Sequence, residues 1–155
     1  MSEVTRLADQ LRRSCFGEAW HGPSLQDILD GMTAEQARLR IAPQTHNIWE
    51  LVLHVTCWNE LAASALNGTP LPDGPESLSW PPIEDTSNAA WEKALERMEQ
   101  AVVAFKEAAE RLDDKGLEDI VPGRPYDMYY LLSGVTQHNL YHAGQMALIK
   151  KALFP

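Results

Sequence analysis

Two histidines, His138 and His142, stand four residues apart in the stretch GVTQHNLYHAGQMALIKK near the C-terminus. The stretch has the apolar spacing of one amphipathic helix. Measured from Met128 at 100° per residue, the apolar positions fall within about ±60°, His142 at about −40° and His138 at about −80°. One histidine is thus expected inside the buried face and the other at its margin, and neither on the solvent side. Because residues four apart rise by about 6 Å, both imidazoles can point at one centre between helices. This is the i, i+4 geometry by which a helix offers two nitrogen ligands to a metal ion.

A third imidazole, His54, lies in the stretch NIWELVLHVTCWNE, beside the apolar stripe of a second predicted helix. Helical bundles build metal sites from inward-facing residues on neighbouring helices, and three neutral histidines leave a coordination position open for water or substrate. The alternative is that each imidazole is a hydrogen-bonded core residue, which is the commoner role of a single inward-facing histidine.

The other two histidines and Cys57 are weaker candidates. His46 precedes His54 by eight residues, or about 12 Å along one helix, so we expect it to cap or support the site rather than share an ion. His21 lies in the turn WHGPS, which could fold over the mouth of the site or be an ordinary surface turn. Cys57 is expected on the far side of its helix, as a packed or partly exposed thiol.

Four polar side chains lie within a turn of the histidines and could orient ligands or substrate: Asn59, Glu60, Tyr141 and Gln145. Gln145 is the best of them, because it shares the edge of the helix face that carries His138. The sequence shows no nucleophile elbow, phosphate-binding glycine loop or CxxC motif. We therefore expect neither a hydrolase triad nor a nucleotide enzyme, and no catalytic side chain is assigned.

Apolar periodicity predicts four long helices that would position these residues, over 3–16, 46–67, 87–113 and 126–153. The third has the seam of a helix packed almost parallel to its neighbours, formed by Trp91, Leu95, Met98, Val102, Phe105, Ala109 and Leu112. Ser87 is its expected N-cap, and Cys15 is expected in the core of the first helix. No segment alternates like a strand, so the sequence predicts an all-α four-helix bundle.

Two long segments connect the predicted helices. The crossover GPSLQDILDGMTAEQARLRIAPQ is expected to be partly helical, with Ser24 and Thr33 as caps, and NGTPLPDGPESLSWPPIEDTS is rich in proline and glycine. Loops of this length in a small domain are usually lids or packed excursions. With no internal repeat or second domain visible, we expect one domain over residues 1–155.

The composition favours a small-molecule partner. Thirteen Lys and Arg against 22 Asp and Glu give a net charge of −9, which argues against nucleic acid or an anionic membrane surface as a partner. No stretch has the pattern of a signal peptide or a membrane span, so a cytoplasmic location is expected. Two cysteines are too few for a disulfide framework and are expected as reduced thiols. A homodimer is left open.

The two histidine-bearing stretches, together with AWHGPSL near the start and the NGTPLP turn, resemble the DinB-like superfamily, which includes YfiT-type metal-dependent hydrolases and thiol-dependent transferases. The most specific parts are His54 followed by Trp58, and the HxxxHxxQ run. The resemblance spans most of the chain. It implies an up-down-down-up four-helix bundle with long crossover loops, whose three histidines hold a divalent metal, commonly nickel or zinc. Those histidines match His54, His138 and His142.

Two functions of different classes follow. The first is a metal-dependent enzyme that activates a small thiol or water, acting as a thiol-dependent transferase or a hydrolase on a small molecule. The resemblance covers both reactions and tilts the choice toward thiol transfer. The second is a non-catalytic metal- or ligand-binding protein of a stress response. A pocket open beside the metal would favour the enzyme, and a closed or metal-free bundle would favour the binding protein.

Overall fold

The computed structural model describes residues 1–154, and helices form most of it. The four long helices are α1 (Glu3–Phe16), α4 (Ile48–Leu66), α6 (Asn88–Glu110) and α7 (Met128–Leu153). Short helices occupy the connections: α2 (Leu25–Leu29), α3 (Ala34–Ala37), α5 (Pro75–Leu78) and the 3-10 turn η1 (Gly116–Glu118). Within residues 1–154 there is no strand, only an isolated bridge between Ile120 and Asp127. The predicted all-α fold is confirmed.

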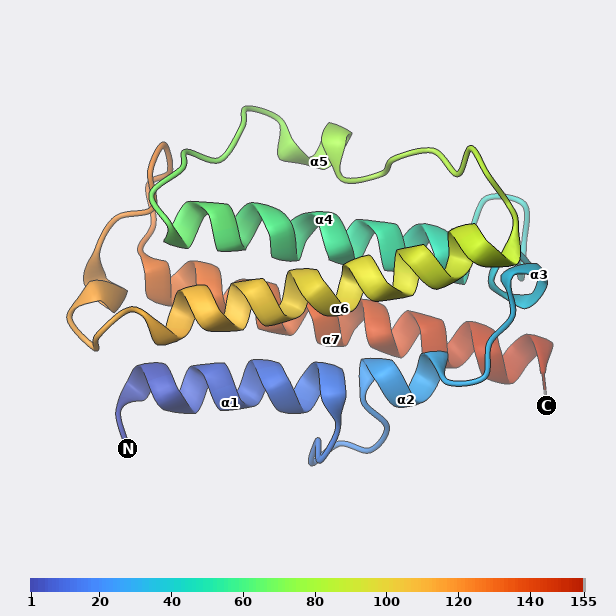
Figure 1. Ribbon diagram of the computed structural model, residues 1–155, viewed down its shortest axis with the longest axis horizontal. Helices are drawn as coiled ribbons and strands as arrows, with labels where there is room; N and C mark the ends of the chain where they lie inside the picture. Colours follow the sequence, from blue (N-terminus) through green and yellow to red (C-terminus); the bar gives the residue numbers. More distant parts are fainter. Residues whose placement is uncertain (155) are drawn as a thin grey trace.

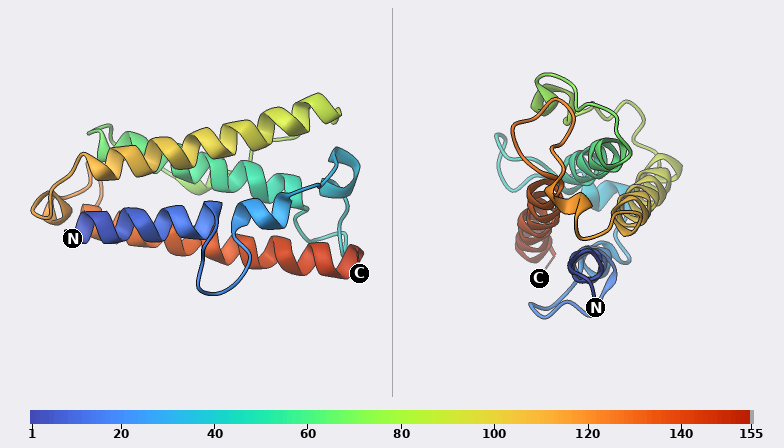
Figure 2. Two further views of the ribbon diagram at one scale, coloured as in Figure 1. Left: turned by 60° about the horizontal axis from the view of Figure 1, so that its bottom comes forward. Right: turned by 90° about the vertical axis from the view of Figure 1, so that its left-hand side faces the viewer.

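The long helices run up, down, down and up. In Figure 1, α1 and α7 run from left to right while α4 and α6 run from right to left. Hydrogen bonds agree: Arg111 donates to the Asn67 side chain, which joins the ends of α6 and α4, and the Val4 backbone donates to Asp114 beyond α6. Seen end-on in Figure 2, the four helices surround one core. This arrangement leaves α4 and α7 antiparallel.

Side-chain caps set where the helices begin. Ser87 accepts the Ala90 backbone N–H, and Ser24 and Thr33 cap α2 and α3, as expected from the sequence. The second long helix begins later than predicted. Asn47 is extended and forms a capping box with Glu50, so α4 starts at Ile48 and His46 lies before it.

The core lies between α4, α6 and the helices that cover them. Val102 and Phe105 in the seam of α6 are fully buried. Leu95 and Leu112 are only partly buried. The helix ends at Glu110 rather than at residue 113, so Leu112, the last predicted residue of the seam, lies two residues beyond it. Among the described residues no helix is long and apolar enough to cross a membrane.

The segment between α4 and α6 is a packed excursion. Figure 1 shows it passing along the outer side of α4, with α5 midway. Leu71, Pro75 and Ser79 are buried, so the excursion lies against the bundle. Cys57 is partly buried on α4, where its thiol faces the Leu78 carbonyl at 3.8 Å, which agrees with the expected partly exposed thiol.

The burial of Val102 gives a stability test of the seam. Val102→Asp places an unpaired charge where no water reaches, and we expect it to cost about 4 kcal/mol or to prevent folding. Val103→Asp is the matched control, because Val103 is 38% exposed on the same helix and should change stability by about 0.5 kcal/mol or less. Urea unfolding measures both, and equal effects would contradict the burial of the seam.

Candidate metal centre

Three imidazole nitrogens meet between α4 and α7. His138 Nε2 lies 3.0 Å from His54 Nε2 and 3.0 Å from His142 Nε2. Together the three histidines offer one ligand atom each within 4.8 Å of one another, a group that could hold a metal ion. His54 and His142 are buried and His138 is half-buried. The antiparallel packing of α4 on α7 therefore brings together the residues that the sequence singled out.

Hydrogen bonds at the outer nitrogens fix two of the rings. The Nδ1–H of His54 donates to the Ser79 carbonyl at 2.9 Å, and the Nδ1–H of His142 donates to Gln145 Oε1 at 2.7 Å. A neutral imidazole carries one proton, so both Nε2 atoms turn a lone pair toward the centre. Lone pairs that face each other repel unless a cation lies between them. The donor set therefore fits a divalent metal ion.

His138 is held differently. Its Nδ1 is buried and has no hydrogen-bond partner among the described residues, so no neighbour fixes the tautomer of this ring. Its Nε2 can face a metal with its lone pair, or donate a hydrogen bond to His54 or His142 when no metal is bound. His138 is thus the ligand that can adapt to the state of the centre.

Burial keeps the centre uncharged. Desolvation lowers the pKa of His54 to about 4, and it outweighs the hydrogen bond to Ser79, which raises that pKa. Desolvation, with His142 and His54 next, lowers the pKa of His138 to about 3. The pKa of His142 is also lowered, again mainly by burial. At neutral pH all three imidazoles are therefore in the uncharged form that binds metal ions.

An unpredicted residue, Trp80, forms the outer wall of the centre. Its indole is stacked between two imidazoles, with ring centroids 3.8 Å from His54 and 3.8 Å from His46. Trp80 follows Ser79, whose carbonyl holds the same histidine, so one turn of the excursion both orients and covers His54. An aromatic residue inside a polar, proline-rich loop was the only signal of this role in the sequence.

Comparison with known proteins agrees with the geometry. A family model described as the DinB superfamily matches residues 19–146, a span that includes all three histidines. The chain belongs to the DinB superfamily. Searches of curated proteins and of solved structures returned no match. The family match supports the helical fold of this DinB-superfamily protein, and its own structure supplies the histidine cluster.

Two polar residues support the centre without being among its three histidines, as expected. Gln145 accepts the hydrogen bond of His142, and its amide nitrogen donates to the Tyr141 hydroxyl at 3.3 Å. His46 precedes α4, contacts Glu50 at 3.2 Å and supports Trp80 by stacking. Both residues therefore act on the centre through a neighbour.

The expectation for Asn59 and Glu60 is wrong. Asn59 is buried and exchanges hydrogen bonds with Asn139, whereas Glu60 forms an ion pair with Arg97 of α6. Both point from α4 toward helix partners rather than toward the histidines. They follow His54 by five and six residues, roughly one and a half turns of α4, which places them on the faces of the helix that pack on the core and on α6.

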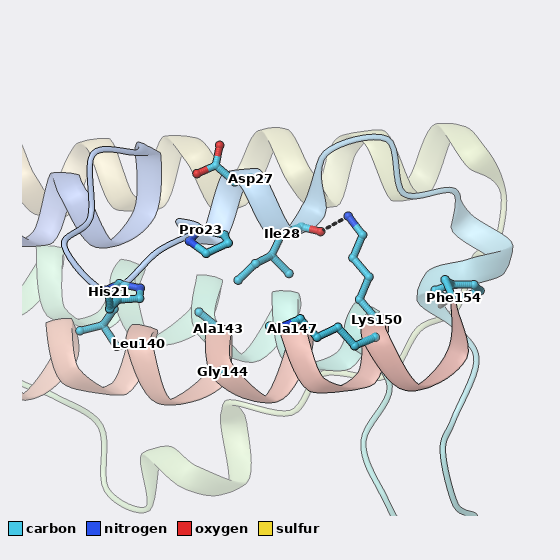
Figure 3. Close-up of a pocket in the computed structure, with 11 residues that line it drawn as sticks. His21, Pro23, Asp27, Ile28, Leu140, Ala143, Gly144, Ala147, Lys150 and Phe154 are labelled. Atoms are coloured by element: carbon cyan, nitrogen blue, oxygen red, sulfur yellow. Dashed lines mark hydrogen bonds between the residues drawn. The ribbon is translucent and has the colours of Figure 1, made fainter.

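His21 does not cover the histidines. It lines a cavity of about 620 Å³ between the start of α2 and the outer face of α7, as Figure 3 shows, with Leu140 beside it. Leu140 and Ala147 stand about 180–200° around α7 from His138, so this cavity lies on the opposite face of the helix. The proposed position over the site mouth is therefore wrong.

The lowered pKa values predict how acid affects the metal-free protein. Below pH 6.5 the unfolded chain binds protons at these histidines while the folded chain does not, so stability falls as the pH drops from 6.5 toward 4. Urea unfolding in a chelator, from pH 7.5 to 4.5, should show this decline. It should be shallower in His138→Asn, and an identical pH slope in the two proteins would refute the buried, neutral state.

The hydrogen bond from His142 to Gln145 predicts a loss of metal affinity. Gln145→Met keeps the length of the side chain but removes the acceptor that orients the ring, and should weaken metal binding about 10- to 100-fold. Tyr141→Phe is the control, because the Tyr141 hydroxyl contacts only Gln145 among these residues. Calorimetric titration with Zn²⁺ measures both variants. Equal affinities would show that the bond does not orient the ligand.

Proposed function

We propose that this DinB-superfamily protein is a metal-dependent enzyme that binds one divalent ion through His54, His138 and His142 and activates a small thiol or water. The observation that carries the proposal is the convergence of three Nε2 atoms, two of them with lone pairs directed inward by hydrogen bonds at Nδ1. Such an arrangement has little use in an ordinary core, where a buried histidine is satisfied by one partner on each side.

The donor set bears on the metal. It contains three imidazoles and no carboxylate or thiolate, which suits zinc or nickel and disfavours magnesium or calcium. Because the ligands are neutral, a bound ion would keep its full charge and supply Lewis acidity that lowers the pKa of a water or thiol at the open position.

The side chains around the centre control what reaches it. Trp80 covers His54 from the excursion, and the rings of Trp58 and His138 meet edge to face, with centroids 5.8 Å apart. These rings keep bulk water from two sides of the centre, which strengthens electrostatic interactions there. The protein thus contributes a dry, oriented ligand set, while the nucleophile comes from a small molecule or from water.

An open cavity beside the centre supports an enzyme over a protein that only binds metal. It has a volume of about 180 Å³ and is lined in part by His138 itself. A non-catalytic site needs no such space, whereas a substrate must approach the open coordination position. Between the two reactions we favour thiol-dependent transfer, a preference that rests on the resemblance to thiol-dependent transferases.

Metal titration followed by spectroscopy tests the proposal. Tag-free, metal-free protein should bind one equivalent of Zn²⁺ or Ni²⁺, and replacing any one of the three histidines by Ala should cut affinity sharply while circular dichroism stays helical. In the cobalt-substituted protein, an added thiol should give sulfur-to-metal charge-transfer absorption. Absence of metal binding would refute the proposal.

Two further outcomes separate the alternatives. Turnover of electrophiles that needs the thiol identifies a transferase, whereas inhibition of turnover by the thiol identifies a hydrolase that uses water. Full metal loading without a spectral response or turnover across a broad panel of thiols and electrophiles would leave the binding protein as the function.

A further inference from the structure

The cavity beside His138 has aromatic walls. Trp58 of α4 forms one side, and the remaining residues come from the start of α7 and the segment before it: Tyr126, Tyr130, Leu131, Gly134 and Val135. We propose that this cavity binds a planar, uncharged group, such as an aromatic ring, of the small molecule whose reactive atom is held at the histidine centre. The inference rests on the proposed function and specifies its substrate class.

The shape of the walls favours a flat group. Tyr126 and Tyr130 lie against each other with ring centroids 5.0 Å apart, and the rings of Trp58 and His138 meet edge to face. Aromatic rings attract other rings in offset or edge-to-face arrangements and bury a large apolar area with little loss of side-chain freedom. At about 180 Å³ the space suits one ring or a short apolar chain rather than a large cofactor.

The charges around the cavity favour a neutral group. No Asp, Glu, Lys or Arg side chain lines it, so a carboxylate or phosphate among these rings would lose its hydration without gaining an ionic partner in the walls. An anionic group would instead be drawn out of the cavity to the metal ion itself. A cation would meet the rings, but it would also lie beside a divalent ion whose three ligands are neutral. Repulsion at that short range in a poorly hydrated pocket opposes a cation.

Gly134 points to space that the protein itself does not fill. It lies inside α7, where glycine costs about 1 kcal/mol relative to alanine. A Cβ atom built there meets nothing within 4 Å, so helix packing does not require a glycine. Because Gly134 lines the cavity, its missing side chain keeps the cavity open.

Gly144 provides a matched control on the same helix. A Cβ atom there also meets nothing within 4 Å, and Gly144 lines the separate cavity on the opposite face of α7, beside Ala143 and Ala147 in Figure 3. Leucine at either position therefore fills one of the two cavities, and the two variants make the same change in helix propensity. Because position 134 is one turn from His138 on α7, the cobalt affinity of each variant is measured first to show that the histidine centre is intact.

The experiment compares two thiols of similar acidity on the cobalt-substituted protein. Benzyl mercaptan should bind at least about tenfold more tightly than 2-mercaptoethanol, as burial of a ring implies, with charge-transfer absorption as the readout. Gly134→Leu should remove this preference while the affinities for cobalt and for 2-mercaptoethanol stay unchanged. Gly144→Leu should keep the preference.

A second variant tests the cavity in case Gly134→Leu disturbs folding. Tyr130→Ala removes one wall of the cavity at a residue that is 65% exposed, so the bundle should tolerate it while the preference for benzyl mercaptan falls. Equal affinity of the two thiols in the unaltered protein would overturn the inference. So would a preference that survives Gly134→Leu.

A metal-free measurement separates this inference from the proposed function. Benzyl alcohol added to the metal-free protein should shift the amide resonances of Gly134 and Val135, and the shift of Val135 should vanish in Gly134→Leu. If cobalt does not bind but these shifts appear, the metal-dependent function fails and the cavity assignment stands. If cobalt binds and the shifts do not appear, the cavity assignment fails.

Discussion

The repulsion between imidazole lone pairs that face one another between α4 and α7 is the constraint on which the site depends. The Ser79 carbonyl and Gln145 Oε1 accept hydrogen bonds from the Nδ1–H groups of His54 and His142, so these two rings cannot relieve the repulsion by changing tautomer without losing a hydrogen bond. Burial also keeps the rings uncharged. A divalent cation satisfies every inward nitrogen at once, which a single proton cannot do.

That convergence requires α4 and α7 to keep a fixed register. Beside the histidines, Asn59 of α4 and Asn139, which directly follows His138 on α7, exchange two buried amide hydrogen bonds, of 2.9 and 3.1 Å. Asn139 also donates to the buried thiol of Cys15 at 3.7 Å, which extends the polar contact to α1. A shift of either helix by one residue would break these bonds inside the core, where unpaired amides are costly. The asparagine pair thus serves the site by holding the helices that carry the ligands.

The long excursion between α4 and α6 joins the fold to the site. The helices α4 and α6 are parallel, so a short loop cannot join the end of one to the start of the other. The chain instead returns along the length of α4, as Figure 1 shows. On this return the chain places Ser79 and Trp80 against His54. The connection that the topology needs therefore also supplies the hydrogen bond and the aromatic cover of one ligand.

The sequence by itself determined what is local in the chain. Apolar periodicity located the four long helices, Ser24, Thr33 and Ser87 were recognised as caps, and the i, i+4 spacing put His138 and His142 on one inward face. These features depend on interactions within a few residues, which spacing records directly. His54, more than 80 residues before His138, was a candidate from its place beside the apolar stripe of its own helix, and the resemblance matched it to the third histidine of the family.

Only the tertiary structure decided which distant groups complete the site. Trp80 and the Ser79 carbonyl come from a loop without periodicity, and Asn59 turned toward Asn139 rather than toward a ligand. His21 lies near the same helix as His138 but against its other face. A helical pattern states which side of a helix is buried, but not which loop or helix covers that side, because the choice is made by the packing of the whole bundle.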